Sequence, residues 1–390
     1  MAEQILDSNG ELKEAAKLES ATEKKCPGCG AALDFSAAVG KLKCPYCETE
    51  VEIPAVKVEP PKMKVGVGQV QKEGAAQENL LDFSKIEKTG NRDWGTATKI
   101  SSCKYCGAEV VMDVNDLSTT CAFCGSNHVT EASDDAGMLS PGGVVPFKVT
   151  QQEASEKFKK WIGGKIFAPN AAKKSAQAES FQGVYLPYWT FDAQTETDYT
   201  GKYGKDRRVK DGDGYKTVTD WYNTQGHHSE FIDDQLICAS KKHTEGFLKQ
   251  IEPFDTGDNK VYSPEYLSGF LAERYTVPLE EGWAGATKDI EAHLRSVVTK
   301  RIKDENRADH SKISTFNIAF SNMTYKYLLL PIWFSSFTFN GKIFQFVVNG
   351  QTGKVGGKYP ISPFKVAIAI LIALAVIILF FVIFGGGSDY

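Results

Sequence analysis

The amino-acid sequence predicts an α+β protein with two zinc ribbons, an internally duplicated antiparallel α+β domain and one C-terminal transmembrane helix. Three observations predict this fold class. Cysteines occur in two sets of paired CxxC motifs with the same spacing. One order of helix and strand patterns occurs twice, and a run of nineteen consecutive apolar residues, 366–384, lies near the end of the chain.

The apolar run is long enough to cross a membrane. As a helix it would measure about 28 Å, close to the roughly 30 Å of a bilayer's hydrocarbon core. A buried core helix would need protein around all its faces, yet only GGGSDY follows. Lys354, Lys358 and Lys365 precede the run and nothing basic follows it, so the positive-inside rule places the bulk of the chain in the cytoplasm. We therefore expect a single-pass protein of the cell membrane, without a signal peptide at residues 1–25.

Composition limits the function classes. The chain has 390 residues, room for two or three domains, and a net charge of −4, so no global basic field attracts nucleic acid. Eight of the nine cysteines lie in CxxC pairs and Cys238 is left over. In a cytoplasmic protein, this spacing favours metal binding over disulfides.

The cysteine spacing is that of a zinc ribbon. In each set, fourteen residues separate the two CxxC pairs, and four thiolates suit tetrahedral zinc. Glycines 30, 107 and 125 directly follow a pair, where a small residue eases a tight turn. We expect two structural Zn²⁺ ions per chain. The predicted ligands are Cys26, Cys29, Cys44 and Cys47 in the first ribbon and Cys103, Cys106, Cys121 and Cys124 in the second.

The predicted domain order follows from these patterns. It comprises an N-terminal segment at 1–25, zinc ribbon 1 at 26–53, a linker at 54–92, zinc ribbon 2 at 93–130, the duplicated α+β domain at 140–362 and the transmembrane helix at 366–384. The linker is rich in Pro, Lys, Gly and Gln, but its end carries an apolar patch that we expect to dock: Leu80, Leu81 and Phe83, followed by Trp94.

Two similar series of elements predict the duplication. Val144–Phe147 and Tyr275–Leu279 each precede an amphipathic helical pattern, the first with Thr150 as a possible N-cap. Leu186-Pro-Tyr-Trp189 and Leu330-Pro-Ile-Trp333 then follow as strands. Such internal repetition is typical of two halves that share one core.

Three further elements are expected. Residues 196–237 predict an antiparallel meander with turns at 203–204, 211–214 and 225–226. Residues 263–274 predict a helix with Ser263 as N-cap and Pro264 at its first position. The stretch 349–354 predicts a hairpin turn.

Motifs for enzymatic chemistry are missing from the sequence. It contains no GxxxxGK[ST], GxSxG or HExxH pattern. His227 and His228 are adjacent on a predicted strand and so point to opposite faces, and Asp211–Gly214 is better explained as a turn than as a calcium loop. We therefore expect no catalytic residue, no cofactor other than zinc, and a protein that is not an enzyme.

The strings LPYWTFDA, SPEYLSGFLAERY and VNGQTGKVGG, with the ribbons and the C-terminal span, resemble a bacterial family of membrane-anchored proteins with TFIIB-type zinc ribbons. Members are often labelled primosomal or replication-helicase-like, and some relatives are associated with phage-shock-protein-A-like and SPFH-type proteins in envelope stress responses. The resemblance implies a membrane adaptor. The helicase label finds no support in this sequence, because nucleotide-binding motifs are missing.

Two functional hypotheses follow, with a weaker third. The first is a cytoplasm-facing adaptor or scaffold that recruits protein partners, phage-shock-protein-A-like or SPFH-type, to the membrane. The alternative is a membrane-tethered zinc-ribbon protein that binds nucleic acid, although acidic residues between the cysteines of the second ribbon disfavour phosphate contacts. The third is an enzyme with an unrecognised site. The sequence leaves oligomerisation open.

Overall fold

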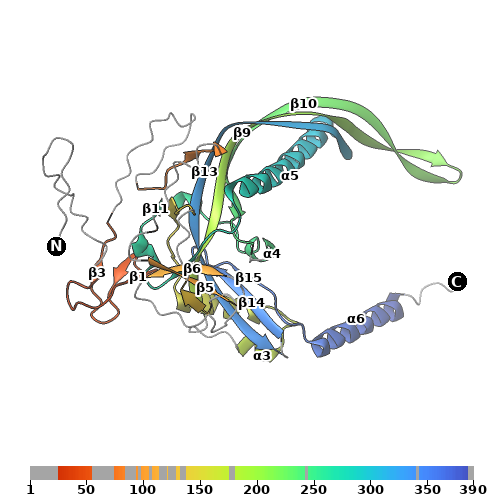
Figure 1. Cartoon of the computed structure of the whole chain (residues 1–390). Coiled ribbons are helices and arrows are strands. Elements are labelled where there is room, and N and C mark those ends of the chain that lie inside the picture. Colours follow the sequence, from red (N-terminus) through yellow and green to blue (C-terminus); the bar gives the residue numbers. More distant parts are fainter. Residues whose placement is uncertain are drawn as a thin grey trace, which may run out of the picture.

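The computed structural model describes residues 25–54, 74–83, 94, 98–104, 108–113, 121, 129–131, 138–174, 181–241, 245–339 and 342–384. Within them the fold is mixed α+β and mostly sheet (Figure 1). The helices are α2 (Gln151–Gly163), α3 (Asn170–Lys174), α4 (Glu245–Leu248), α5 (Leu279–Asn306) and α6 (Pro363–Phe384), with 3₁₀ turns η2 (Thr256–Asp258) and η3 (Pro264–Leu267). The strands are β1 (Asp34–Ser36), β2 (Lys41–Lys43), β3 (Glu50–Val51), β4 (Asn79–Leu80), β5 (Thr98–Cys103), β6 (Glu109–Asp113), β7 (Val129–Glu131), β8 (Gly143–Val144), β9 (Gln182–Asp211), β10 (Gly214–Cys238), β11 (Lys260–Val261), β12 (Leu271–Glu273), β13 (His310–Phe339), β14 (Lys342–Asn349) and β15 (Val355–Gly357).

Two long antiparallel strands, β9 and β13, form the centre of the large sheet. Their Leu-Pro-x-Trp segments pair with each other, with Pro187 opposite Leu329 and Pro331 opposite Tyr185. Beyond this centre, β9 and β10 extend as an arm, with β13 alongside and α5 beneath it (Figure 1). The two proline-containing strands are thus the middle of the fold. Pro187 and Pro331 have no N–H to donate, but their carbonyls accept hydrogen bonds from the N–H groups of Ala239 and Gly350.

Both amphipathic helices form as predicted. Thr150 caps α2 in a capping box with Glu153, and Ala154, Phe158 and Ile162 are buried. Along α5, Ala286, Ile290, Leu294, Val298 and Ile302 are buried at helical spacing against the arm. These apolar stripes fix each helix on the sheet.

The predicted meander is wrong: residues 182–238 form one long hairpin. The turn at 211–214 is confirmed, with Gly212 at φ +63°. The glycines at the other two expected turns lie inside strands. Glycine is needed at these positions because neighbouring side chains fill the space that a Cβ would occupy. A Cβ on Gly226 would lie 2.4 Å from the hydroxyl oxygen of Tyr199, and one on Gly204 would lie 2.6 Å from a methyl carbon of Thr219.

The helix predicted at 263–274 is also wrong. Pro264 does begin a turn, but η3 ends at Leu267, and the hydroxyl of Ser263 bonds to the Glu265 carboxylate rather than to the backbone. Gly269 then adopts φ +79°, which directs the chain into β12. That strand pairs with both β6 and β9, so sheet pairing replaces the last two helical turns.

The cysteine-containing segments are joined to this body in different ways. Strands β1, β2 and β3 form a separate small sheet, whereas β5, β6 and β7 belong to the large sheet through the pairing of β6 with β12. Of the apolar patch expected to dock, Leu81 and Trp94 are buried, and Leu80 and Phe83 stay exposed. The expected hairpin turn at 349–354 connects β14 to β15.

Candidate functional site

Four cysteines of the first ribbon converge on one point. The sulfurs of Cys26 and Cys47 lie 3.3 Å apart, and those of Cys29 and Cys44 lie 3.5 Å apart. All four sulfurs lie within 4.8 Å of one another. Tetrahedral zinc with bonds of about 2.3 Å requires sulfurs about 3.8 Å apart, so this donor set fits one tetrahedral metal ion.

The backbone around each CxxC pair explains why the sulfurs converge. The N–H of Cys26 donates to the carbonyl of Ala31 at 2.7 Å, and the N–H of Cys44 donates to that of Thr49 at 2.9 Å. Each bond spans five residues and folds its CxxC pair into a tight knuckle. Gly30 adopts φ +75° in the first knuckle, which favours glycine there, as predicted.

Local hydrogen bonds favour the thiolate at Cys26 and Cys47. At Cys29 a backbone hydrogen bond near Ala31 lowers the pKa, but the adjacent sulfurs of Cys44 and Cys47 outweigh it and raise the pKa to about 12. The Thr49 hydroxyl, 3.1 Å from the sulfur of Cys47, lowers the pKa of Cys47. Desolvation opposes ionisation of Cys26, but hydrogen bonds from Cys47 and from the backbone near Gly28 and Cys29 lower its pKa to about 6. Thiolates are the metal-binding form of cysteine, so these contacts suit a metal ligand set.

The second cysteine set is described in part. Cys103, at the end of β5, and Cys121 are buried together with Ala108 and Val129 beside them. The N–H of Cys103 donates to the carbonyl of Ala108 at 2.8 Å, which repeats the five-residue bond of the first ribbon's knuckles. Cys106 and Cys124 lie outside the described residues, so the second four-ligand set remains a prediction.

Phe35 links the first ribbon to the body. Phe35 donates its N–H to the carbonyl of Ser268 at 3.1 Å, and its ring lies 5.5 Å from that of Tyr266 and 6.2 Å from that of Phe270. The tip of the second knuckle points away: Tyr46 is 80% exposed. All four sulfurs would be ligands, so this centre keeps no position for a catalytic water, and Tyr46 is free to contact another molecule.

The predicted membrane span forms the helix α6. It projects from the body, and none of the apolar stretch Pro363–Phe381 is buried within the protein (Figure 1). Its length and composition suffice to cross a membrane. A helix that is apolar on all sides and uncovered is consistent with a single membrane anchor.

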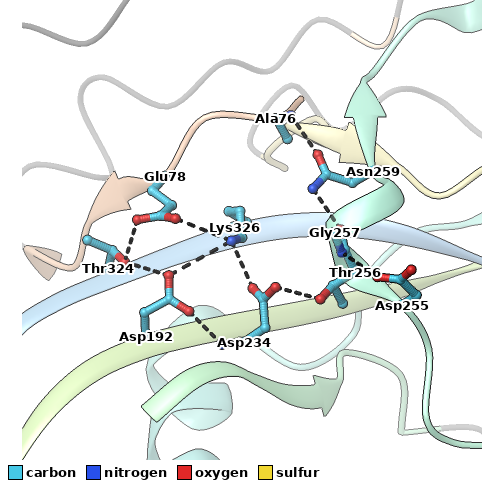
Figure 2. Close-up of polar contacts among 10 residues, drawn as sticks. All are labelled: Ala76, Glu78, Asp192, Asp234, Asp255, Thr256, Gly257, Asn259, Thr324 and Lys326. Atoms are coloured by element: carbon cyan, nitrogen blue, oxygen red, sulfur yellow. Dashed lines mark hydrogen bonds and ion pairs between the residues drawn. The ribbon is translucent and has the colours of Figure 1, made fainter. Parts of the chain in front are cut away.

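A buried ion-pair cluster connects the segment 74–83 to the sheet (Figure 2). The Lys326 ammonium lies 2.8 Å from Asp234, 3.5 Å from Glu78 and 3.8 Å from Asp192. The Thr324 hydroxyl donates to Asp192 at 3.0 Å and to Glu78 at 3.3 Å. Because β4 also pairs with β13 at Thr324 and Tyr325, this cluster holds residues 74–83 against the central strands.

The electrostatics of the cluster are unbalanced, with three carboxylates around one ammonium. Burial raises the pKa of Asp192 to about 6, and Lys326 only partly opposes this. Burial would lower the pKa of Lys326, but Asp234, Asp192 and Glu78 together raise it. Asp192, Asp233 and Asp234 lie close enough to hold a cation, yet Lys326 already supplies a positive charge there, which favours a structural role.

The sequence patterns considered above did not predict this cluster. Asp192 lies within LPYWTFDA and Lys326 within TYKYLLL, so each is a charge in an otherwise apolar strand. That pattern could have identified them, because a charged residue in a buried strand needs a partner.

Other polar residues singled out in the sequence have local partners. His227 lies 2.7 Å from Glu196 and 2.8 Å from Asp198, and His228 lies 2.9 Å from Glu230. These are exposed or half-buried ion pairs on the arm, with the two histidines bonded to different groups. Cys238 is half-buried at the end of β10, with its sulfur 3.8 Å from the carbonyl oxygen of Ser240.

The chain is similar to an uncharacterized bacterial protein. The chain is 28% identical over 349 residues to the uncharacterized protein YdjG of Bacillus subtilis (strain 168), an alignment that covers 88% of this chain and 91% of the relative. No family model matches the chain, and no solved structure matches it.

Proposed function

We propose that this protein is a membrane-anchored, cytoplasm-facing adaptor that uses two structural zinc ribbons and its α+β body to hold protein partners at the membrane. The observation that carries the proposal is the pairing of a closed four-cysteine centre with an uncovered apolar helix in one chain. The first suits a stable contact module without chemistry of its own, and the second suits attachment to a bilayer.

Zinc is the ion proposed for both ribbons. Four thiolates at these distances are the ligand set of structural zinc sites, and binding of the ion supplies folding energy of roughly 10–16 kcal/mol to a module too small for a core. The matching backbone bond at Cys103 supports a second ribbon of the same kind. We propose two ions per chain.

The partner classes are proteins similar to phage-shock protein A or to SPFH-type proteins, with a role in envelope stress. This part rests on the sequence resemblance described above. An exposed aromatic tip such as Tyr46 suits protein contact, since aromatic residues are enriched at protein interfaces. Neither enzymatic turnover nor nucleic-acid binding is part of the proposal.

We further propose that residues 140–362 arose by duplication. This proposal is supported by two backbone hydrogen bonds in one half that have equivalents in the other half. The carbonyl of Pro187 accepts from Ala239, whose own carbonyl accepts from Val277. In the other half, the carbonyl of Pro331 accepts from Gly350, whose carbonyl accepts from Val149 in the same way.

Affinity capture of the full chain from detergent-solubilised membranes tests the adaptor role. Proteins similar to phage-shock protein A, or SPFH-type proteins, should copurify with the natural chain. They should be lost with Cys44→Ser, which removes a ligand from the first ribbon. Cys238→Ser is the matched control, because this cysteine lies outside the CxxC pairs, and it should keep the partners. Partners retained by Cys44→Ser, or nucleic acid as the main copurifying species, would contradict the proposal.

A further inference from the structure

The start of α6 is bonded to the loop between α2 and α3. The N–H of Ser362 donates to the carbonyl of Phe167 at 2.8 Å. The Lys365 ammonium donates to the carbonyl of Ala168 at 2.7 Å and to the side-chain oxygen of Asn170 at 3.1 Å. In Figure 1, α3 and the start of α6 lie at the same end of the large sheet. The loop at 164–169 therefore sits at the depth at which the apolar helix begins.

Large apolar side chains are exposed on both of these bonded segments. Ile166 in the loop is 77% exposed, and Ile361 and Phe364 are 61% and 73% exposed. Single exposed apolar residues are common on soluble proteins. Here, however, Phe364 lies in the first turn of a helix that is itself apolar on all sides, and Ile166 and Ile361 lie on the segments bonded to or preceding that turn. A bilayer that receives α6 would cover them as well.

Basic residues surround this end of the molecule. Residues 157–174 contain Lys157, Lys159, Lys160, Lys165, Lys173 and Lys174 and no acidic residue, and residues 352–365 contain Lys354, Lys358 and Lys365 and again no acidic residue. The whole chain has a net charge of −4, so positive charge is concentrated here. Lysines close to an anionic membrane surface are attracted to it electrostatically, and their attractions add up.

Two aromatic rings complete the pattern. The Lys165 ammonium lies 4.7 Å from the ring centroid of Trp161 and 5.5 Å from that of Tyr359. The two rings meet edge to face, with centroids 5.8 Å apart. Trp and Tyr are enriched where a protein crosses from water into lipid, because their rings have an apolar body and a polar tip.

We propose that the α2–α3 loop and residues 358–365 form a second membrane contact around the first turn of α6, in addition to the crossing by the rest of that helix. Ile166, Ile361 and Phe364 enter the boundary between headgroups and acyl chains, and the surrounding lysines bind anionic phospholipid headgroups. The proposal rests on the proposed membrane anchor and goes beyond it. Since hydrogen bonds attach the loop to α6, the contact fixes the orientation of the body relative to the bilayer. With the span alone, the body could rotate freely about its attachment point.

Depth-dependent fluorescence quenching tests the proposal on the full chain in nanodiscs of phosphatidylcholine and phosphatidylglycerol. An environment-sensitive fluorescent amino acid is placed at position 166, at Leu374 inside α6, or at Tyr215, which is 73% exposed at the tip of the arm. Brominated phospholipids should quench most of the fluorescence at 374 and at 166, and none at 215. Unchanged zinc content shows that each labelled chain is folded.

The outcomes separate this proposal from the anchor itself. Quenching at 374 with none at 166 overturns the second contact and leaves the anchor standing. Absence of quenching at 374 overturns the anchor, and the second contact with it. In discs of phosphatidylcholine alone, quenching at 166 should fall severalfold while that at 374 is unchanged; equal quenching at 166 in both lipids overturns the role of the lysines.

Discussion

The indole N–H of Trp189 donates to the backbone carbonyl of Val277 at 2.9 Å and joins the first Leu-Pro-x-Trp strand to the residue before the N-cap of α5. Trp333 makes the equivalent bond, at 2.8 Å, to Val149, just before α2. Each tryptophan thus holds the helix that precedes the other strand in the sequence. The two halves of the body are interlocked, because neither helix is fixed by its own half alone.

Replacing Trp189 by Phe should destabilise the whole body. The change leaves the carbonyl of Val277 without its buried partner and opens space beside Gly282, whose Cα approaches the indole so closely that a Cβ would lie 2.7 Å from it. We expect a loss of roughly 2–4 kcal/mol in the free energy of unfolding, measured by denaturant titration of the full chain in detergent. Trp333→Phe should cost a similar amount.

The matched control for this prediction is Trp221→Phe on the arm, where the ring is 38% exposed. It should change the free energy of unfolding by less than about 1 kcal/mol. Equal losses for Trp189→Phe and Trp221→Phe would show that the interlocking bond contributes little.

Metal content should be two zinc ions per chain. Elemental analysis of the reduced, purified protein measures it. Cys26→Ser should bind one ion instead of two, because the first ribbon forms its own sheet and the second is part of the large sheet. A natural chain that is folded yet nearly free of zinc would remove the ribbon interpretation, and loss of both ions in Cys26→Ser would show that the two sites are coupled.

Nucleic acid should bind weakly and without sequence preference. Affinity for phosphates depends on basic surface and falls steeply with salt. Here the lysine-rich end faces the bilayer under the proposal above, and the net charge is −4. For the full chain in phosphatidylcholine nanodiscs, titrated with labelled DNA and RNA at two salt concentrations, we expect dissociation constants no tighter than about 10⁻⁴–10⁻⁶ M. Submicromolar, sequence-dependent binding that Cys121→Ser abolishes would instead favour the tethered nucleic-acid protein.

Local patterns in the sequence predicted the elements whose causes are local. The Thr150 cap, the apolar stripe of α5 and the knuckle around Gly30 each depend on residues within a few positions of one another. The apolar run at 366–384 is similar, since its composition alone decides whether it suits lipid.

Elements decided by distant partners were predicted wrongly. Gly204 and Gly226 lie in sequences typical of turns. In the fold they lie within strands, where the side chains of Thr219 and Tyr199 on paired strands leave no room for a Cβ. Residues 263–274 have a helical pattern, but pairing with β6 and β9 captures Leu271–Glu273 as a strand. The cluster around Lys326 unites four charged residues far apart in sequence, and only the folded sheet brings them together.

Protein stability should depend on pH through Asp192. Burial raises the pKa of this carboxyl from 3.8 to about 6, so the folded protein binds its proton more tightly than the unfolded chain does. The contribution of Asp192 to stability is therefore greatest below about pH 4 and falls as the pH rises to about 6, after which it is constant. The expected loss across this window is about 2–3 kcal/mol, from 1.36 kcal/mol per pKa unit.

Asp192→Asn isolates this effect. The amide keeps an oxygen that can accept the N–H of Asp234, a bond of 2.6 Å, but it cannot titrate. The free energy of unfolding of the full chain in detergent, measured from pH 4 to pH 7, should fall less for the variant than for the natural protein. The control Asp213→Asn, at the exposed turn of the arm, should keep the natural pH dependence. If Asp192→Asn and Asp213→Asn give the same slope, the buried carboxyl is not the titrating group, and the cluster stays fully ionised in the folded protein over this range.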